Sequence, residues 1–342
     1  MKISFVIPVY NTETYIDTCL SSIINQGLDE EEFEIVIVND GSTDSSLEHC
    51  TAFARQHSNV VVISQKNSGV GIARNTGMEA SHGDWICFVD SDDYLCTGGI
   101  KAVLSLVNGK PYNMVRFWSR IVSESFYGAG IELGSINYIG NGHGFIKKFG
   151  MDVFCYTYLY DRKWLLHTGI TFEDFRIAED YLFVSKLLLL NPEVVSTTVR
   201  LYNYVKHQNS ITGDRTPGHT ASLARSYIAL IDNLANYSSE IPDLDSELRL
   251  CVIKSLQGKM RSFMSRVLCS NIDVKEFKQM LEKLRNYSII PLSSYSNQNF
   301  SRLYTYVINL IINHPSLLYL YRFFYRIFIV KYIIPRIEKN RI

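Results

Sequence analysis

Short apolar runs and helix-like segments alternate through the first hundred residues, and this alternation constrains the fold more than any other feature. Apolar, β-branched runs predict buried strands at Ile3–Ile7, Phe33–Val38, Val60–Ser64 and Trp85–Val89. Amphipathic spacing predicts helices between them at Tyr15–Gln26, Ser45–His57 and Gly71–Ala80. Strands that alternate with helices form βαβ units, so we expect an α/β fold with a doubly wound, mainly parallel sheet.

Polar clusters follow three of these strands. Pro8-Val9-Tyr10-Asn11 follows the first strand, Asn39-Asp40-Gly41-Ser42 the second, and Asp90-Ser91-Asp92-Asp93 the fourth. Open α/β sheets bind ligands in the crevice beyond the carboxyl ends of their strands. The segments that predict the fold therefore also predict a ligand site.

The rest of the chain has weaker strand signals and a long helical region. Met114–Trp118 is strand-like, and further ordered segments are expected at Thr157–Tyr160 and Arg162–His167, before a helix at Glu179–Leu190. Residues 221–286 are predicted to be helical, with a loop from Ser238 to Asp245. Because 342 residues are too many for one compact core, we expect two domains, residues 1–215 and 216–342.

Charge and cysteine content limit the classes of function. The chain has 34 Lys and Arg against 34 Asp and Glu, so its net charge gives no reason to expect a nucleic-acid partner. Its seven cysteines are scattered, without C-x-x-C spacing, which argues against a zinc site or a disulfide framework and for a reducing cytoplasm. The apolar start ends at Pro8 and no stretch of about 18 apolar residues occurs, so we expect neither a signal peptide nor a spanning helix.

Three carboxylates close together after a buried strand predict a metal site. Asp90, Asp92 and Asp93 repel one another unless a cation or a donor group of a substrate stands between them. Hard oxygen ligands favour Mg²⁺ or Mn²⁺, and a diphosphate would supply the remaining coordination. The alternative is an acidic helix cap, which needs one carboxylate rather than three.

Glycine-containing segments follow the second and third strands. Asp40 is placed to accept a hydrogen bond from a base or a ribose, although a plain strand–turn–helix corner is the alternative. Gly69-Val70-Gly71 superficially suggests a dinucleotide fingerprint, but Arg74 occupies the third glycine position and no suitably placed acidic residue follows. We therefore reject that fingerprint, and note that a basic residue near a helix start suits a diphosphate.

Together these segments resemble the amino-terminal half of glycosyltransferase family 2, whose members have the GT-A fold. The resemblance rests on Val6-Ile7-Pro8-Val9-Tyr10-Asn11, Asn39-Asp40-Gly41-Ser42-Thr43-Asp44, Asn67-Ser68-Gly69 with Ala73-Arg74-Asn75, and Asp90-Ser91-Asp92-Asp93. It implies a GT-A-like sheet with a mostly helical C-terminal region. Residues 1–100 would bind the nucleotide sugar and residues 101–215 would form the acceptor side.

The resemblance also implies roles for individual residues. The donor nucleotide would be bound by Pro8, Tyr10, Asn11, Asp40, Asn67, Gly69, Arg74, Asp90 and Ser91. Within this set Asp40 would read uracil and Asp90 would lie near the ribose. Asp92 would bind the metal.

Two later segments are similar to the remaining family pattern. Glu179-Asp180 resembles the family's Glu-Asp pair at a helix start. By this resemblance Asp180, with Glu179 beside it, would be the catalytic base. The alternative is a purely electrostatic role of the two residues at the helix N-terminus. Tyr204–Thr212 resembles the segment that closes over the diphosphate, except that Val205 replaces a common arginine and Lys206 would substitute for it. His207 is either a metal ligand or a structural residue.

These residues predict an inverting, metal-dependent glycosyltransferase that uses Mn²⁺ or Mg²⁺ and a nucleotide-sugar donor, with UDP as the leaving group. The acceptor would be a glycan or a lipid-linked saccharide in surface polysaccharide or glycolipid assembly. The tryptophan motif of processive synthases is absent, so we expect one sugar per encounter. The alternatives are an inactive sugar-nucleotide-binding module, which would have lost a carboxylate, and a nucleotidyltransferase, which would have a Gly-rich, lysine-bearing loop in place of Pro8–Asn11.

The last forty residues predict a contact with an anionic surface. From Arg302 to the end there are seven basic residues and one acidic residue, Glu338. At helical spacing Arg322, Arg326 and Arg336 share a face, which favours a peripheral membrane helix over Leu317–Ile337 at the inner face of the cell membrane. The alternative is a helix pair that packs on the catalytic domain or on a second subunit of a homodimer.

Overall fold

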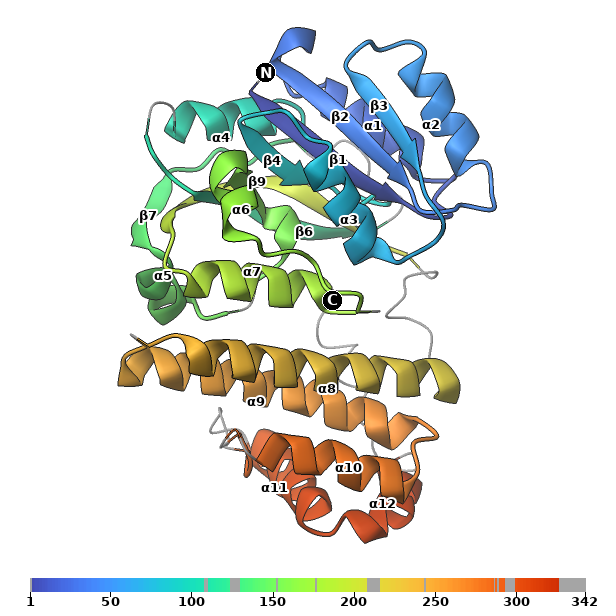
Figure 1. Ribbon diagram of the computed structural model, residues 1–342, viewed down its shortest axis with the longest axis vertical. Helices are drawn as coiled ribbons and strands as arrows, with labels where there is room; N and C mark the ends of the chain where they lie inside the picture. The colour runs from blue at the N-terminus through green and yellow to red at the C-terminus, as the bar shows by residue number, and fades with distance from the viewer. Residues whose placement is uncertain are drawn as a thin grey trace. The chain divides into compact units, whose positions relative to one another are not determined.

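The computed structural model divides into two compact units, residues 1–210 and residues 211–342 (Figure 1). The described residues are 2–107, 110–123, 130–151, 153–175, 177–207, 216–242, 244–285, 287, 289–292 and 299–325. The first unit contains a sheet with its helices, and the described part of the second unit is helical.

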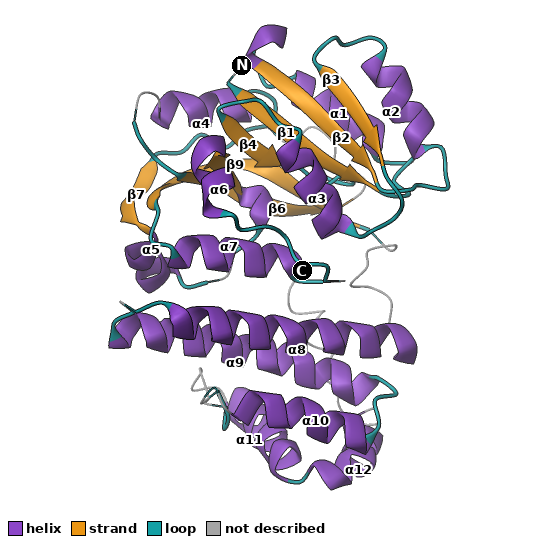
Figure 2. Ribbon diagram, in the orientation of Figure 1, coloured by secondary structure: helices purple, strands orange, loops and turns teal. Residues whose placement is uncertain are grey.

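A mixed sheet forms the centre of the first unit (Figure 2). Its strands are β1 (Ile3–Val9), β2 (Phe33–Asn39), β3 (Val60–Ser64), β4 (Trp85–Phe88), β5 (Tyr94–Leu95), β6 (Met114–Ser123), β7 (Ile136–Asn141), β8 (Tyr158–Asp161) and β9 (Glu193–Lys206). They lie in the order β3-β2-β1-β4-β8-β6-β9-β5, and β7 pairs with β9. The first four strands are parallel to one another and β6 is parallel to β9, whereas β5, β7 and β8 run antiparallel to their neighbours.

Helices connect the strands of this sheet. They are α1 (Ile16–Ile24), α2 (Ser46–Ala54), α3 (Val70–Glu79), α4 (Gly99–Val107), α5 (Gly142–Phe149), α6 (Arg162–Thr168) and α7 (Glu179–Leu189), with a short 3₁₀ turn, η2, at Cys155–Thr157. Helix α3 packs on β1 and β2, where a Cβ atom on Gly77 would come within 2.4 Å of Val6 Cγ1. The α/β order predicted for the first hundred residues is confirmed.

Strands β1 and β2 are buried along their whole length. Parallel strands that are covered on both faces read as continuous apolar runs, which is why the sequence predicts them well. The side chains of one face form a core with α1 and α4, around Phe5, Ile37 and Leu20, and Val36 and Val38 of the other face pack on α3. This core fixes the strand ends from which the polar clusters project.

Strands β7 and β9 are not predicted from the sequence. Strand β9 contains Ser196, Thr197 and Asn203, all of them buried, and these polar residues interrupt the apolar pattern. Two of them find their partners in distant parts of the chain: Thr197 Oγ1 donates to Arg116 O at 3.1 Å and Asn203 Nδ2 to Tyr94 O at 3.3 Å. Only the folded sheet supplies these partners.

The second unit consists of helices in its described part. They are α8 (Pro217–Glu240), α9 (Ser246–Cys269), α10 (Val274–Arg285), α11 (Asn299–Asn313) and α12 (Leu318–Phe324). Asp245 caps α9, since its Oδ1 accepts a hydrogen bond from Leu248 N at 2.9 Å. Within the described residues, the helical region predicted for residues 221–286 is confirmed, although α8 continues through Glu240 into the predicted loop.

Arg322 of α12 does not point outward as the membrane interpretation requires. Its side chain is buried, and Nη2 donates to the carbonyl oxygens of Val267 in the last turn of α9 at 2.9 Å and of Ile272 just after α9 at 2.5 Å. Carbonyls at a helix C-terminus lack partners within the helix, so Arg322 joins α12 to α9, and its predicted place on a lipid-facing surface is wrong. Residues 326–342, with Arg326 and Arg336, lie outside the described residues. Within the described ranges, no helix has the length and apolarity needed to span a bilayer.

Candidate active site

The carboxyl ends of β1, β2 and β4 lie side by side at one edge of the sheet. Val9 pairs with Asn39, and Asp40 N donates to Val9 O at 2.8 Å. On the other side of β1, Val89 N donates to Val6 O at 3.0 Å. The three polar clusters that follow these strands are therefore neighbours in space.

Reciprocal hydrogen bonds tie the segment after β1 to the segment after β2. Asn11 Oδ1 accepts from Thr43 N at 2.8 Å, and Asn11 N donates to Ser42 Oγ at 3.2 Å. Asn11 has a φ of 52°, in the left-handed region that asparagine tolerates better than most residues. Asn11 thus shapes the loop in which Tyr10 is exposed. Pro8 precedes this loop and is buried within β1.

The carboxylate of Asp40 holds the loop that follows β3. Its Oδ1 accepts from Gln65 Nε2 at 2.8 Å and from Ser68 N at 2.9 Å, and its Oδ2 accepts from Gly69 N at 2.9 Å. Asp40 is buried, whereas Asn67 in this loop is exposed. Asp40 therefore anchors the loop that follows β3, and its predicted contact with the nucleoside stays a prediction.

Two glycines allow these loops to approach each other. Gly41 has a φ of 74° and Gly69 a φ of 92°, values that favour glycine. A Cβ atom on Gly41 would lie 2.9 Å from Asn67 N, closer than such contacts normally come. A side chain at Gly41 would therefore push the two predicted donor-binding loops apart.

The acidic turn after β4 separates its carboxylates into different environments. Asp93 is buried, and its oxygens accept from Tyr202 Oη at 2.7 Å and from Val205 N at 2.8 Å. Burial, followed by the charges of Asp92 and Asp90, raises the pKa of Asp93 well above its usual range. Asp93 thus fastens the turn to β9, a role that the sequence does not reveal because β9 is not recognised there. Ser91 in the same turn is buried.

The two predicted metal ligands lie together. His207 Nε2 is 2.8 Å from Asp92 Oδ2, and the imidazole ring packs on Tyr15 with a centroid distance of 4.8 Å. In the described part of the chain, no three or more Asp, Glu, His or Cys side chains form a group that could hold a metal ion. Lys206 is exposed beside them, and residues 208–212 of the segment that begins at Tyr204 lie outside the described residues.

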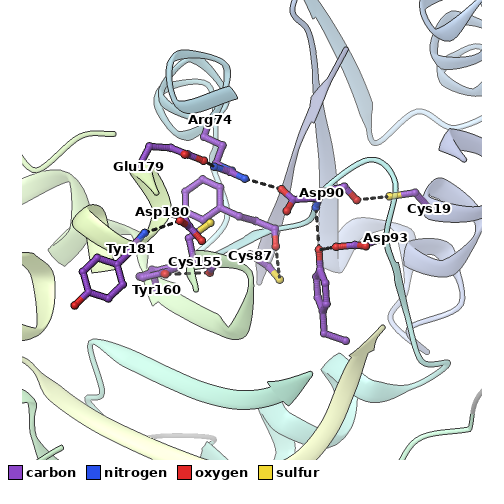
Figure 3. A network of polar contacts seen from close by, with 12 residues as sticks. Cys19, Arg74, Cys87, Asp90, Asp93, Cys155, Tyr160, Glu179, Asp180 and Tyr181 are labelled. Carbon is purple, nitrogen blue, oxygen red and sulfur yellow. Dashed lines mark hydrogen bonds and ion pairs between the residues drawn. The ribbon is translucent and has the colours of Figure 1, made fainter. Parts of the chain in front are cut away.

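Arg74 joins the acidic turn to the start of α7. Its Nη2 is 2.7 Å from Asp90 Oδ1 and its Nη1 is 2.6 Å from Glu179 Oε1 (Figure 3). The guanidinium is buried and lies over the Phe172 ring, 5.4 Å from its centroid. Both terminal nitrogens therefore bond to carboxylates, and the predicted contact of Arg74 with a diphosphate stays a prediction.

Glu179 and Asp180 form the first turn of α7. The helix begins after Ala178, which has a φ of 67°, and Tyr181 N donates to Asp180 Oδ1 at 2.7 Å. Burial and the neighbouring charge of Glu179 raise the pKa of Asp180 to about 7, against the opposing effects of Arg74 and of the Tyr181 N–H. A carboxyl group with this pKa exchanges a proton near neutral pH, as a general base must.

Asn75 positions the segment that carries Asp180 against α3. Its Nδ2 donates to Phe172 O at 2.8 Å, and its Oδ1 accepts from Phe172 N at 2.8 Å. Gly71 allows the close approach, since a Cβ atom there would lie 2.8 Å from Glu173 O. Asn75 stands in one of the matched motifs, but its partner lies 97 residues away and is not evident from the sequence.

Comparison with known proteins gives similarities over most of the chain. Residues 4–167 match the family model described as Glycosyl transferase family 2. The chain is 30% identical over 290 residues to Glycosyltransferase GlyG of Streptococcus pneumoniae, covering 82% of this chain and 89% of that protein. It is 28% identical over 302 residues to Glycosyltransferase GlyA of the same organism, covering 83% of this chain but 41% of GlyA, so it spans less than half of that relative.

Among solved structures, the chain is similar to Staphylococcus aureus TarS 1–349 in complex with UDP-GlcNAc. The TM-score is 0.66 at 20% sequence identity, and the superposition covers 92% of this chain and 91% of that one. At this level of identity the similarity concerns the fold. The predicted α/β, GT-A-like fold class is confirmed by it.

Proposed function

Because the chain belongs to glycosyl transferase family 2, we propose that it transfers one sugar from a nucleoside-diphosphate donor to an acceptor hydroxyl, with inversion at the anomeric carbon. The observation that carries this proposal is the Asp90–Arg74–Glu179 ion-pair network, which brings the acidic turn after β4 to the helix start that bears Asp180. In-line displacement requires a leaving group and a base on opposite sides of the anomeric carbon. The network joins the acidic turn, the candidate for the side of the leaving group, to the helix of Asp180, the candidate for the side of the base.

Asp180 is the proposed general base. It lies at the N-terminus of α7, and its raised pKa of about 7 lets it accept the proton of the acceptor hydroxyl at neutral pH. Glu179 acts beside it through its charge and through its bond to Arg74. The hydrogen bond from Tyr181 N to Asp180 Oδ1 would hold the carboxyl group of the base while the sugar moves to the acceptor oxygen.

Uridine is the proposed nucleoside of the donor, bound by Pro8 near the end of β1 and by the loops that contain Tyr10, Asn11, Asn67 and Gly69. A carboxylate offers about four acceptor positions. Three protein donors occupy Asp40, which leaves capacity for one more N–H, such as the imide N–H of uracil. Uridine diphosphate should therefore protect the protein against heat better than guanosine diphosphate does, and equal protection would contradict the assignment.

Asp92 and His207 are the proposed protein ligands of Mn²⁺ or Mg²⁺. Neighbouring ligands of an octahedral ion with bonds of about 2.1 Å lie about 3 Å apart, close to the 2.8 Å between Asp92 Oδ2 and His207 Nε2. Two protein ligands leave the remaining positions to the diphosphate and water. When bound, the metal would stabilise the negative charge of the departing diphosphate.

The acceptor is proposed to be a saccharide of a surface polysaccharide or glycolipid, reached from a membrane. Apolar side chains of the second unit are exposed on α11, α12 and the turn between them: Tyr306, Leu317, Tyr319, Leu320 and Phe323. We name this set the α11–α12 patch. Aromatic and aliphatic residues followed by a basic sequence suit a peripheral contact with anionic lipid, and a second subunit is the other occupant that the patch would suit.

A donor screen tests the transfer activity. The purified chain is incubated with Mn²⁺ and a panel of sugar nucleotides, and the released nucleotide is identified. Release of nucleoside diphosphate, with UDP-sugars as the best donors, is the expected result. Release of pyrophosphate would indicate nucleotidyl transfer, and binding without any release would indicate an inactive binding module.

A further inference from the structure

Three aromatic rings stack on one another beside the acidic turn. Tyr202 Oη donates to Asp93 Oδ2 at 2.7 Å and accepts from Asp90 N at 3.1 Å, so this ring is fixed beneath the turn. Tyr156 stacks on Tyr202 with a centroid distance of 4.4 Å and an interplanar angle of 21°. Phe154 stacks on Tyr156 at 5.4 Å and 14°. The three rings form a continuous ladder.

Exposure rises along this ladder from the turn to the surface. Tyr202 is 0% exposed, Tyr156 8% and Phe154 40%. Single exposed apolar residues are common and need no explanation by themselves. Phe154 differs because two buried rings support it, and because Thr157 fixes its backbone by donating from N at 3.1 Å and from Oγ1 at 2.8 Å to Phe154 O. An exposed ring that is held this rigidly loses little entropy when a ligand packs on it.

The ladder lies close to the carboxylates of the proposed reaction. Burial raises the pKa of Tyr156, and the negative charges of Asp90, Asp180 and Asp93 raise it further, so the phenol is within electrostatic range of all three. The turn η2, which contains Tyr156, contacts both α7 and β4. The turn that carries Tyr156 therefore packs against the helix that bears the proposed base.

The position of the ladder in the sheet favours the acceptor over the donor. The proposed nucleoside loops follow β1, β2 and β3, on one side of β4. Tyr156 comes from the turn before β8, and Tyr202 from β9, both on the other side of β4 in the strand order. A ligand on Phe154 would thus lie on the side of β4 opposite the proposed nucleoside loops.

We propose that Phe154, supported by Tyr156 and Tyr202, is a subsite for the acceptor saccharide, with the apolar face of a sugar ring packed on the exposed face of the phenyl ring. The C–H groups on one face of a pyranose carry a small positive charge, which suits the negative face of an aromatic ring. The subsite rests on the proposed function in that the acceptor is a saccharide. It deepens that function by assigning the residue that holds the acceptor ring.

Saturation-transfer NMR tests the subsite without requiring turnover. The probes are the methyl β-glycosides of glucose, galactose and N-acetylglucosamine, each added to the chain with UDP and Mn²⁺. We expect saturation of the ring C–H protons of one face in at least one glycoside, and affinity roughly threefold to tenfold weaker in Phe154→Ala. Phe154→Trp should retain the contact. Absence of transfer to all three glycosides, or equal transfer from Phe154→Ala, would overturn the subsite.

Ile139→Ala is the matched control, because Ile139 is an exposed apolar residue of the same unit. Ile139 pairs with Val195, seven residues from Tyr202 on β9, which is on the order of 20 Å along the strand. The control should leave the saturation pattern unchanged, and a loss equal to that of Phe154→Ala would also contradict the subsite. The affinity for UDP, measured by calorimetry, should be the same in both variants. If the donor screen finds no nucleotide release while Phe154-dependent saturation persists, the transfer activity is contradicted, and Phe154 is a saccharide-binding residue without an acceptor role.

Discussion

Arg74 and Glu179 form a buried ion pair of 2.6 Å although 105 residues separate them in the chain. The same guanidinium bonds to Asp90, so one arginine links the strand end beside the proposed donor site to the helix that carries the proposed base. A charge in such a place is stable only while its partners remain. The geometry of the site is therefore coupled to the folding of the first unit.

Replacing Arg74 with Gln should destabilise the fold as well as the site. Removing one partner of a buried ion pair leaves charges without compensation and costs about 3–5 kcal/mol. Arg225→Gln is the matched control, because Arg225 pairs with Glu276 but its side chain is 54% exposed, against 4% for Arg74. The control should cost less than about 1 kcal/mol. Urea denaturation measures the free energy of unfolding of both variants. A loss in Arg74→Gln as small as that in the control would show that the Arg74 network is not important for stability.

Activity should fall as the pH decreases through about 7. The pKa of Asp180 is raised to about 7, so its carboxyl group becomes protonated below that pH and can no longer accept a proton. Glu179→Gln removes a charge that raises this pKa, so the acidic limb should move to lower pH in that variant. The pH dependence of kcat at saturating donor, measured for the unmodified chain and for Glu179→Gln, gives the acidic limb of each. A limb that does not move would mean that Glu179 does not act on the base.

Asp92→Ala should remove the effect of metal on UDP binding. With Asp92 present, UDP and Mn²⁺ together should raise the melting temperature, since ligand at 100 times its Kd adds about 2.7 kcal/mol. Without Asp92, His207 is the only remaining proposed protein ligand, and added Mn²⁺ should bring no further protection by UDP. Differential scanning fluorimetry with and without EDTA gives the comparison. Full protection by UDP in EDTA would argue against a metal at this site.

The first hundred residues reveal their fold because local signals and tertiary environment agree there. Strand β1 is apolar along its length and is covered on both faces, so its apolar sequence is enough to predict a buried strand. Strand β9 is also mostly buried, but Asn203 and Thr197 depend on partners that only the folded sheet brings near.

The residues of the candidate site likewise divide into those that the sequence predicts and those that it does not. Asp92 and His207 can be predicted from motifs and lie 2.8 Å apart in the structure. The partners of Arg74 cannot be predicted, because nothing in its motif indicates Glu179. For Arg322 the sequence prediction is wrong: helical spacing placed it on a lipid-facing surface, whereas it is buried and bonds to the carbonyl oxygens of Val267, in the last turn of α9, and of Ile272, just after it.

Membrane binding should depend on the α11–α12 patch. The double variant Leu317→Ser with Leu320→Ser removes exposed apolar side chains and keeps the buried Leu318, so the fold should persist. We expect roughly tenfold weaker binding to vesicles that contain phosphatidylglycerol. Flotation of the chain with these vesicles at low and high salt is the measurement. If the unmodified chain does not float at low salt but sediments as a dimer that the double variant abolishes, the patch is a subunit interface instead.

The central claim is that Asp180 acts as the base, and Asp180→Asn tests it most directly. The amide keeps the shape of the side chain but cannot take the proton, so turnover should fall roughly 10²–10⁴-fold. Asp84→Asn is the control, because Asp84 is an exposed carboxylate at the opposite end of β4 from Asp90, and it should behave like the unmodified chain. The measurement is kcat with the best donor of the screen, together with the Kd for UDP by calorimetry. Lost turnover with unchanged UDP affinity is the predicted result. Unchanged turnover with weakened UDP binding would contradict the account and make Asp180 a donor contact.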